Sequence, residues 1–155
     1  MALDKTKVVY QIYPKSYKDT TGNGIGDFRG IIEKIPYLAE LGVDMVWLNP
    51  FYPSPQRDNG YDISDYTDID PMFGCLDDMQ RLIEEGKKRG IYMIMDLVLN
   101  HSSDEHKWFI EAKKSRENPY RDYYLWRDGK EGVLPNDMKA ACGGPAWEWV
   151  PEVAD

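Results

Sequence analysis

The sequence predicts an α/β fold built on a parallel sheet, and three observations support this prediction. Three segments rich in β-branched and aromatic residues recur along the chain, amphipathic helical patterns fill the two intervals between them, and the third segment is apolar at nearly every position. Strands that alternate with helices in this order pair in parallel, because each helix returns the chain to the same end of the sheet. With 155 residues and an apolar content of 42%, the chain is large enough to bury a core.

Three strands are predicted at residues 8–13, 44–48 and 91–99. Pro14 stops the first and Pro50 the second, because proline removes a donor from the ladder. The third does not alternate between apolar and polar side chains, which is the pattern of a parallel strand covered on both faces. We therefore expect all three strands to be buried.

Two helices are predicted between the strands. Residues 28–41 place apolar side chains at steps of three and four up to Gly42, a natural carboxyl-terminal cap, and Pro36 is expected to break this stretch or to begin a second helix within it. Residues 76–89 repeat the pattern. Their acidic start and basic end complement the helix dipole, and Gly90 ends the helix.

The pattern changes after the third strand. Ser102 and Glu105 have the spacing of a capping box, which predicts a helix through residues 108–112. From Asn118 onward the chain is rich in Pro, Gly, Tyr and Trp without a clear period, and it reaches Asp155 without a final helix or strand. We interpret this part as an irregular subdomain cut in mid-course, so the chain is expected to be a piece of a larger protein.

Composition and charge argue against several classes of function. The chain carries 27 acidic and 19 basic side chains, a net charge of −8, which argues against partners such as nucleic acids and membrane surfaces. No apolar run is long enough to cross a bilayer and residues 1–7 have no secretion signal, so a cytoplasmic location is expected. Cys75 and Cys142 lie in unlike contexts and are expected to be free thiols or buried side chains rather than a disulfide.

The segment 19–27 has the oxygen spacing of a calcium-binding loop. Side-chain oxygens stand at positions 1, 3, 5 and 9, a glycine at 6 and an available carbonyl at 7, in the order Asp19, Thr21, Asn23, Asp27, Gly24 and Ile25. The loop is not an EF-hand, because Gly30 occupies position 12 where a bidentate glutamate is required. A glycine-rich turn whose side chains cap their own backbone is the alternative, and both interpretations stay open.

Polar residues also follow the second and third strands. In the loop after the second strand, Asp58 and Asp62 can hold sugar hydroxyl groups and Tyr61 offers a ring face, while a solvated acidic turn is the alternative. Asn100 and His101 end the third strand, at the edge where α/β barrels place their sites. A purely structural histidine is the alternative for His101.

Asp96 stands inside the apolar third strand. An unpaired carboxylate there would cost several kcal/mol, on the order of the burial penalty of a polar group, so we expect it to be hydrogen-bonded. His106 follows His101 in the sequence, but no HExxH motif or cysteine pair accompanies them, and no zinc site is predicted. The chain also lacks the nucleophile elbow, the Walker loop and the dinucleotide fingerprint.

Four segments together resemble the α-amylase family of glycoside hydrolases, in particular its bacterial α-glucosidases (oligo-1,6-glucosidase, dextran glucosidase and trehalose-6-phosphate hydrolase). They are YQIYPKS at residues 10–16, the loop 19–27, DNGYDISDY at 58–66 and DLVLNHSSDEH at 96–106. The resemblance covers nearly the whole chain. It implies a retaining hydrolase of short α-glucosides, such as oligo-1,6-glucosides or trehalose 6-phosphate, that acts in carbohydrate metabolism.

The resemblance implies a (β/α)8 barrel of which this chain supplies the N-terminal part. Because a complete barrel takes about 250 residues, residues 1–101 would form its first three strands. Residues 102–155 would begin a domain inserted after the third strand. An open three-stranded sheet leaves its edges and apolar helix faces uncovered, so the chain by itself is expected to self-associate.

The resemblance also implies roles for individual residues. Asp58 would hold the non-reducing glucose, Tyr61 would stack on its ring and His101 would hydrogen-bond it, while Asp96 and Asn100 would shape the floor of the site. The metal loop would hold a structural Ca²⁺ through Asp19, Thr21, Asn23, the carbonyl of Ile25, and Asp27.

The resemblance assigns no catalytic residue to this chain. Retaining glycosidases use two carboxylates about 5 Å apart, and in the family these two and a supporting aspartate belong to strands after the fourth. We therefore predict that residues 1–155 alone are inactive. A non-catalytic scaffold of the same fold is the alternative.

Three places depart from the family pattern. Thr21 and Asn23 stand where Asn and Asp are frequent, which predicts weak calcium binding. Asp137 and Met138 replace an Asn–Trp pair, and Cys142 replaces an aromatic residue beside the scissile bond. The last two changes leave the leaving-group specificity open.

Overall fold

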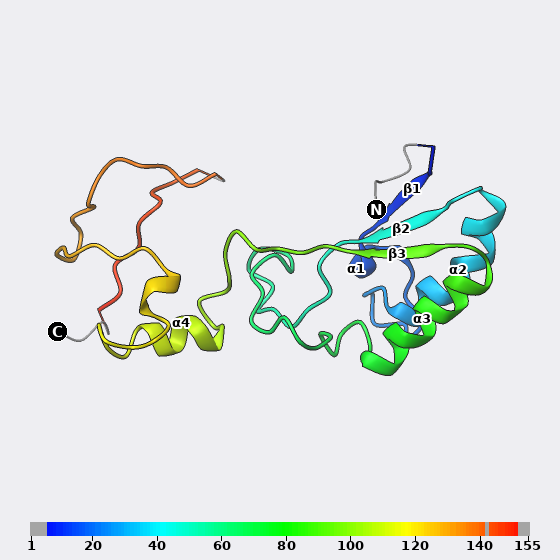
Figure 1. Ribbon diagram of the computed structural model, residues 1–155, viewed down its shortest axis with the longest axis horizontal. Helices are drawn as coiled ribbons and strands as arrows, with labels where there is room; N and C mark the ends of the chain where they lie inside the picture. The colour runs from blue at the N-terminus through cyan, green and yellow to red at the C-terminus, as the bar shows by residue number, and fades with distance from the viewer. Residues whose placement is uncertain (1–5, 142, 152–155) are drawn as a thin grey trace. The chain divides into compact units, whose positions relative to one another are not determined.

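The computed structural model describes residues 6–141 and 143–151. The chain divides into two compact units, Met1–Ser103 and Asp104–Asp155. The first unit holds the sheet and its helices, and the second holds a short helix followed by irregular chain (Figure 1). Among the described residues, no helix has the length and apolarity to span a membrane.

The first unit is built on a parallel sheet. Its strands are β1 (Val9–Ile12), β2 (Met45–Leu48) and β3 (Tyr92–Met95), paired in the order β1-β2-β3. The predicted α/β fold class is therefore confirmed, although each strand is shorter than predicted. The ladder ends with the hydrogen bonds from Asn49 N to Ile12 O and from Asp96 N to Leu48 O, so residues 97–99 leave the sheet.

Two long helices lie side by side along one face of the sheet (Figure 1). They are α2 (Phe28–Glu40) and α3 (Leu76–Lys88), and a four-residue helix, α1 (Pro14–Tyr17), follows β1. Both long helices confirm the sequence prediction. Pro36 does not interrupt α2, contrary to the prediction, because Ile35 directly before it and Leu38 two residues after it are buried in the core. Their packing outweighs the single backbone hydrogen bond that the proline removes.

Asp27 begins α2. Its carboxylate accepts hydrogen bonds from the backbone N–H of Gly30 at 2.7 Å and from that of Thr20 at 2.8 Å, which permits an acidic side chain to be buried. Gly42 and Gly90 follow the two long helices with φ of 81° and 74°, the left-handed conformation that a glycine cap supplies. The predicted ends of both helices are thus confirmed.

Among the described residues of the first unit, helices cover one face of the sheet. Val46 and Leu48 of β2 belong to the same buried cluster as the apolar side chains of α2 and α3. The side chains that alternate with them face the other way, and Tyr92 of β3 is 61% exposed. Leu97 and Leu99 are 63% and 76% exposed. The prediction that the third strand is covered on both faces is therefore wrong within the first unit, because no other described element of this unit packs on the open face.

The second unit starts with helix α4 (Lys107–Ala112). Its N-cap is the buried His106, whose Nδ1 accepts a hydrogen bond from the N–H of Trp108 at 3.0 Å. The predicted capping box is therefore wrong, because His106 supplies the acceptor one residue before the helix. A 3-10 turn, η1 (Arg121–Tyr123), follows, and beyond it the described residues contain only two isolated β-bridges. The chain is therefore irregular here, as its sequence pattern indicates, and its assignment to an inserted domain stays a prediction.

Gly30 provides a test of the packing around α2. Helix propensity alone predicts that Gly30→Ala stabilises the protein by about 1 kcal/mol. The structure predicts the opposite, because a Cβ at this position would stand 2.1 Å from the backbone oxygen of Lys18. We expect urea unfolding to show a loss of about 2 kcal/mol or more. Lys34→Ala, at an exposed position of α2, is the control with little effect, and a stabilised Gly30→Ala variant would contradict the packing described.

Candidate functional site

A chain of hydrogen bonds crosses the carboxyl ends of all three strands. Gln11 Nε2 donates to Asn49 Oδ1 at 2.8 Å, and Asn49 Nδ2 donates to the hydroxyl oxygen of Tyr61 at 3.0 Å. The Tyr61 hydroxyl in turn donates to Asp96 Oδ2 at 3.2 Å. Gln11 lies in β1, Asn49 and Asp96 directly follow β2 and β3, and Tyr61 comes from the loop after β2. One network therefore joins the ends of the three strands.

Strand geometry explains why these side chains meet. In the register of the sheet, Trp47 of β2 pairs with Gln11 of β1 and with Ile94 of β3. Asn49 follows Trp47 by two residues, and Asp96 follows Ile94 by two residues. Side chains two residues apart share a face, so all three polar side chains lie on the open face of the sheet. Sequence reasoning missed Gln11 and Asn49. Their signal is a polar side chain at the same end of each apolar strand.

Asp96 and Tyr61 form the centre of the network. Asp96 is half-buried rather than enclosed, because it lies where the edge strand ends, and the prediction that it is hydrogen-bonded is confirmed. Burial, and then the charge of Asp96, raise the pKa of Tyr61. The hydroxyl of Tyr61 therefore keeps its proton at neutral pH and stays a donor to the carboxylate.

His101 lies against Tyr61. Its Nε2 is 3.1 Å from the backbone oxygen of Tyr61, and its Nδ1 is 3.1 Å from Asn100 Nδ2. Because an amide nitrogen donates, Nδ1 is the acceptor and Nε2 carries the proton. The hydroxyl of Tyr66 donates to the backbone oxygen of His101 at 2.7 Å, a contact that sequence reasoning missed. The structure thus brings Tyr61, Asp96, Asn100 and His101 to one edge of the sheet.

Asp62 closes the loop that carries Asp58. Ser54 Oγ donates to Asp62 Oδ1 at 2.7 Å, and the N–H of Arg57 donates to Oδ2 at 2.8 Å. Burial alone would raise the pKa of Asp62, but the hydrogen bonds from Ser54 and from backbone N–H groups outweigh it and hold this pKa below its usual value. Asp62 therefore stabilises the loop, as the alternative of an acidic turn predicts, whereas the carboxylate of Asp58 is exposed. A sugar-binding role for Asp62 stays a prediction.

The loop 19–27 is wrapped around the carboxylate of Asp19. Oδ1 accepts hydrogen bonds from the N–H groups of Thr21 and Gly22 at 2.7 and 2.8 Å, and Oδ2 accepts one from that of Gly24 at 2.7 Å. These bonds, that of Gly24 first, hold the pKa of Asp19 below its usual range. Among the described residues, no three His, Cys, Asp or Glu side chains gather around a metal position. The self-capping turn that the sequence left open is thus present.

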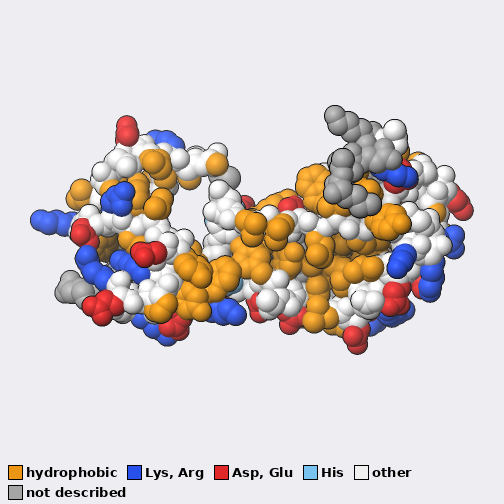
Figure 2. Space-filling model, in the orientation of Figure 1, with side chains coloured by type: hydrophobic (Ala, Val, Ile, Leu, Met, Phe, Trp, Pro, Cys, Tyr) orange, Lys and Arg blue, Asp and Glu red, His pale blue; other side chains and the backbone are white. Residues whose placement is uncertain are grey.

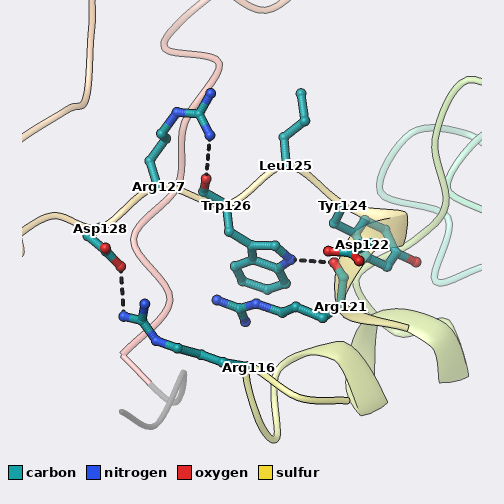
Figure 3. Close-up of a pocket in the computed structure, with 8 residues that line it drawn as sticks. All are labelled: Arg116, Arg121, Asp122, Tyr124, Leu125, Trp126, Arg127 and Asp128. Atoms are coloured by element: carbon teal, nitrogen blue, oxygen red, sulfur yellow. Dashed lines mark hydrogen bonds and ion pairs between the residues drawn. The ribbon is translucent and has the colours of Figure 1, made fainter. Parts of the chain in front are cut away.

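The second unit contains a pocket of about 510 Å³ beside η1 (Figure 3). The guanidinium of Arg121 lies 3.7 Å from the centroid of the Trp126 ring, and Phe109 is stacked nearly parallel to that ring at 5.7 Å. Arg116 and Asp128 form an ion pair of 2.7 Å. These groups are already paired with one another, so we interpret the pocket as part of the packing of the second unit.

Of the positions after the third strand that depart from the family pattern, the structure describes Asp137 and Met138. Met138 is exposed, and its backbone oxygen accepts a hydrogen bond from the N–H of Ala146 at 2.9 Å. Cys75 is an exposed free thiol, as expected. Cys142 lies outside the described residues, as does most of the amino-terminal segment 1–7. The effect of Asp137, Met138 and Cys142 on specificity therefore stays a prediction.

The parallel sheet, with its polar residues at the carboxyl ends of the strands, is typical of α/β enzymes. Residues 11–154 match the family model described as the alpha amylase catalytic domain. The chain therefore belongs to the α-amylase family, as the resemblance of its motifs indicated.

Individual relatives are glycoside hydrolases and a related synthase. Oligo-1,6-glucosidase of Parageobacillus thermoglucosidasius is 61% identical over 145 residues, covering 94% of this chain and 26% of that protein. Trehalose-6-phosphate hydrolase of Escherichia coli K12 is 55% identical over 142 residues, 92% of this chain and 26% of that protein. Among solved structures, a mutant of the trehalulose synthase MutB in complex with glucose superposes with a TM-score of 0.93 at 53% identity, covering 98% of this chain and 27% of that one.

The likeness confirms the predicted family and fold class. The chain has the fold of part of an α-amylase catalytic domain and spans 26% of the length of these two curated relatives.

The role of the Tyr61 network in stability can be measured directly. Tyr61→Phe removes the hydroxyl that Asn49 and Asp96 share and leaves both polar groups in place, so we expect a loss of about 1–2 kcal/mol in the free energy of unfolding. Tyr92→Phe is the matched control, because Tyr92 is exposed on the same sheet. Equal stability of the two variants in urea would show that the network does not contribute to folding.

Proposed function

We propose that the protein containing this chain is a retaining α-glucosidase that hydrolyses short α-glucosides, with oligo-1,6-glucosides and trehalose 6-phosphate as the candidate substrates. The observation that carries the proposal is the group of Tyr61, His101 and Asp96 at the carboxyl edge of the sheet, in a chain of the α-amylase family. Sites of α/β barrels lie at this edge. The curated relatives above are hydrolases of this kind by name.

In this proposal the chain binds the substrate and does not break its bond. The ring of Tyr61 supplies an apolar face for a glucose unit, and its hydroxyl is held by Asn49 and Asp96, so the ring has a fixed orientation. The exposed carboxylate of Asp58 offers an acceptor to sugar hydroxyl groups. The Nε2–H of His101 points at the backbone oxygen of Tyr61, so a sugar hydroxyl that binds His101 replaces this hydrogen bond. We propose that the nucleophile and the general acid belong to parts of the protein outside residues 1–155.

The activity is tested with the intact gene product that contains residues 1–155. We expect it to hydrolyse a chromogenic α-glucoside and to release α-glucose first in proton NMR, because two inversions at the anomeric carbon retain its configuration. Isomaltose and trehalose 6-phosphate, compared by kcat/KM, identify the substrate. Residues 1–155 alone are the control and should give no turnover.

Three results would contradict this function. One is the release of β-glucose as the first anomer, and another is the conversion of a disaccharide into an isomer without release of glucose. The third is turnover by residues 1–155 alone. No turnover of any α-glucoside by the intact protein would favour the non-catalytic scaffold.

We also propose that the loop 19–27 holds a structural Ca²⁺. The donor set fits a hard cation, because it offers two carboxylates, an amide, a hydroxyl and a backbone carbonyl: Asp19, Asp27, Asn23, Thr21 and Ile25. Asp19 Oδ2 accepts a single hydrogen bond, from the backbone N–H of Gly24, and so keeps a further lone pair for a cation. Because Asp27 also caps α2, an ion in this loop would stabilise the start of that helix.

Calcium binding is tested by calorimetry and thermal unfolding of the intact gene product. We expect CaCl₂ to raise its Tm, by an amount equivalent to about 2.7 kcal/mol at a hundred times the Kd. Asp19→Asn should abolish this shift, because it removes one of the two negative charges. Asp122→Asn, at an exposed position of the second unit, is the control and should respond like the parent. A Tm that calcium leaves unchanged would refute the site.

We further propose that residues 1–155 self-associate when isolated. The open face of the sheet and the segment after β3 expose large apolar side chains, among them Tyr92, Leu97 and Leu99. Figure 2 shows a broad apolar area on the surface of the first unit. In addition, β1 and β3 each have one unpaired edge among the described residues. Exposed apolar strands and edges pair readily with other chains.

Light scattering of the isolated chain tests this association. We expect species larger than a monomer, and we expect Leu97→Lys to reduce them, because a charge beside an edge strand opposes pairing. Leu125→Lys is the matched control, since Leu125 is also exposed but lies in the second unit. A monodisperse monomer at all concentrations would rule out self-association.

We place the protein in the cytoplasm as the last part of this proposal. Cys75 is an exposed free thiol, which a reducing compartment preserves. Cell fractionation that finds the enzyme in the medium or the periplasm would contradict this location.

A further inference from the structure

The loop that carries Asp58 has an unusual backbone. Gln56 and Asn59 have φ of 62° and 52°, and Gly60 has φ of 101°. Side chains other than glycine rarely adopt the left-handed region, so this loop is strained on both sides of Asp58. Strain of this kind persists only where the surroundings hold the backbone in place.

Two side chains from the first βα connection hold this loop. The hydroxyl of Tyr13 donates to the backbone oxygen of Asn59 at 2.6 Å, and Lys15 Nζ donates to Gln56 Oε1 at 3.2 Å. Tyr13 directly follows β1, and Lys15 lies in α1. The two contacts therefore fix the residues on either side of Arg57 and Asp58 and leave these two exposed side chains between them.

The side chain of Gln56 contains a buried amide nitrogen, Nε2, without a hydrogen-bond partner among the described residues, which is unfavourable. The same nitrogen is 3.8 Å from the position that a Cβ on Gly60 would occupy, so the amide is packed inside the loop. Unsatisfied buried amides are rare in folded proteins. The contact that Gln56 makes through its oxygen is the hydrogen bond from Lys15 Nζ.

The charge of Asp58 acts on Tyr13, the other side chain that holds this loop. Burial, and second the charge of Asp58, raise the pKa of Tyr13. The phenol therefore stays protonated and remains a donor to Asn59 at neutral pH. The charge of Asp58 thus acts on the Tyr13 hydroxyl through space, and the hydroxyl itself donates to the backbone oxygen of Asn59.

We propose that Tyr13 and Lys15 are positioning residues for Asp58, and that this clamp sets the affinity of the site for the non-reducing sugar of the substrate. The clamp rests on the proposed function, in which Asp58 binds that sugar. It contributes to binding in the ground state and the transition state alike, because Asp58 would touch a sugar hydroxyl and not the bond that breaks. Loss of such uniform binding raises KM and leaves kcat nearly unchanged.

A double-mutant cycle in the intact gene product tests the clamp with a chromogenic α-glucoside. We expect Tyr13→Phe to raise KM about tenfold with kcat changed less than about twofold. Asp58→Asn should raise KM at least as much, and the double variant should be no worse than Asp58→Asn alone, because the two residues act through one contact. Tyr37→Phe, at an exposed position of α2, is the control with parental kinetics.

The outcomes separate the clamp from the proposed function. If Asp58→Asn raises KM but Tyr13→Phe does not, or if the two effects multiply, the clamp is refuted and the function stands. If Asp58→Asn leaves KM unchanged, the role of Asp58 in the proposed function fails as well. Lys15→Met tests the same clamp from its other end, so a folding defect in Tyr13→Phe does not protect the proposal. An unchanged KM in Lys15→Met would refute the role of Lys15.

Discussion

The hydroxyl of Tyr61 is the interaction on which the candidate site depends. It accepts a hydrogen bond from Asn49 and donates one to Asp96, and so connects the ends of β2 and β3 to the loop between them. The backbone of Tyr61 also receives the ring of His101. One tyrosine thus sets the distance between the loop and the strand ends, and a change at any of these groups reaches the others.

A second constraint is the one-sided covering of the sheet. Helices α2 and α3 bury one face, and the open face exposes apolar side chains that end in the polar network. The side-chain period of two places the apolar and polar groups on the same face, with the polar groups only at the carboxyl end. An uncovered apolar face is unfavourable in water. This face therefore explains both the proposed association of the isolated chain and the proposed place of the site within a larger barrel.

The loops are held by their own polar groups more than by apolar packing. Asp19, Asp27 and Asp62 accept hydrogen bonds from backbone N–H groups, and two of these carboxylates have lowered pKa values for this reason. Short loops with few apolar side chains need such bonds, because unpaired backbone groups near the core are costly. The same acidic residues would supply the ligands of a cation. Structural and functional uses of an acidic loop are therefore compatible in this fold.

The sequence by itself determined the α/β class, the two long helices with their glycine caps, and the family, because these follow from local periodicity and from motifs of adjacent residues. Only the tertiary structure decided that Pro36 continues a helix, that His106 caps α4 and that one face of the sheet is open. It also showed that Gln11 and Asn49 join Tyr61 and Asp96, and that Asp62 closes a loop. The open face, the continuous helix at Pro36 and the polar network depend on contacts between residues far apart in the chain, and such contacts can outweigh the local preference that a sequence pattern records. The hydrogen bonds of His106 and Asp62 join residues that are close in the chain, but they form in irregular segments that have no repeating sequence pattern.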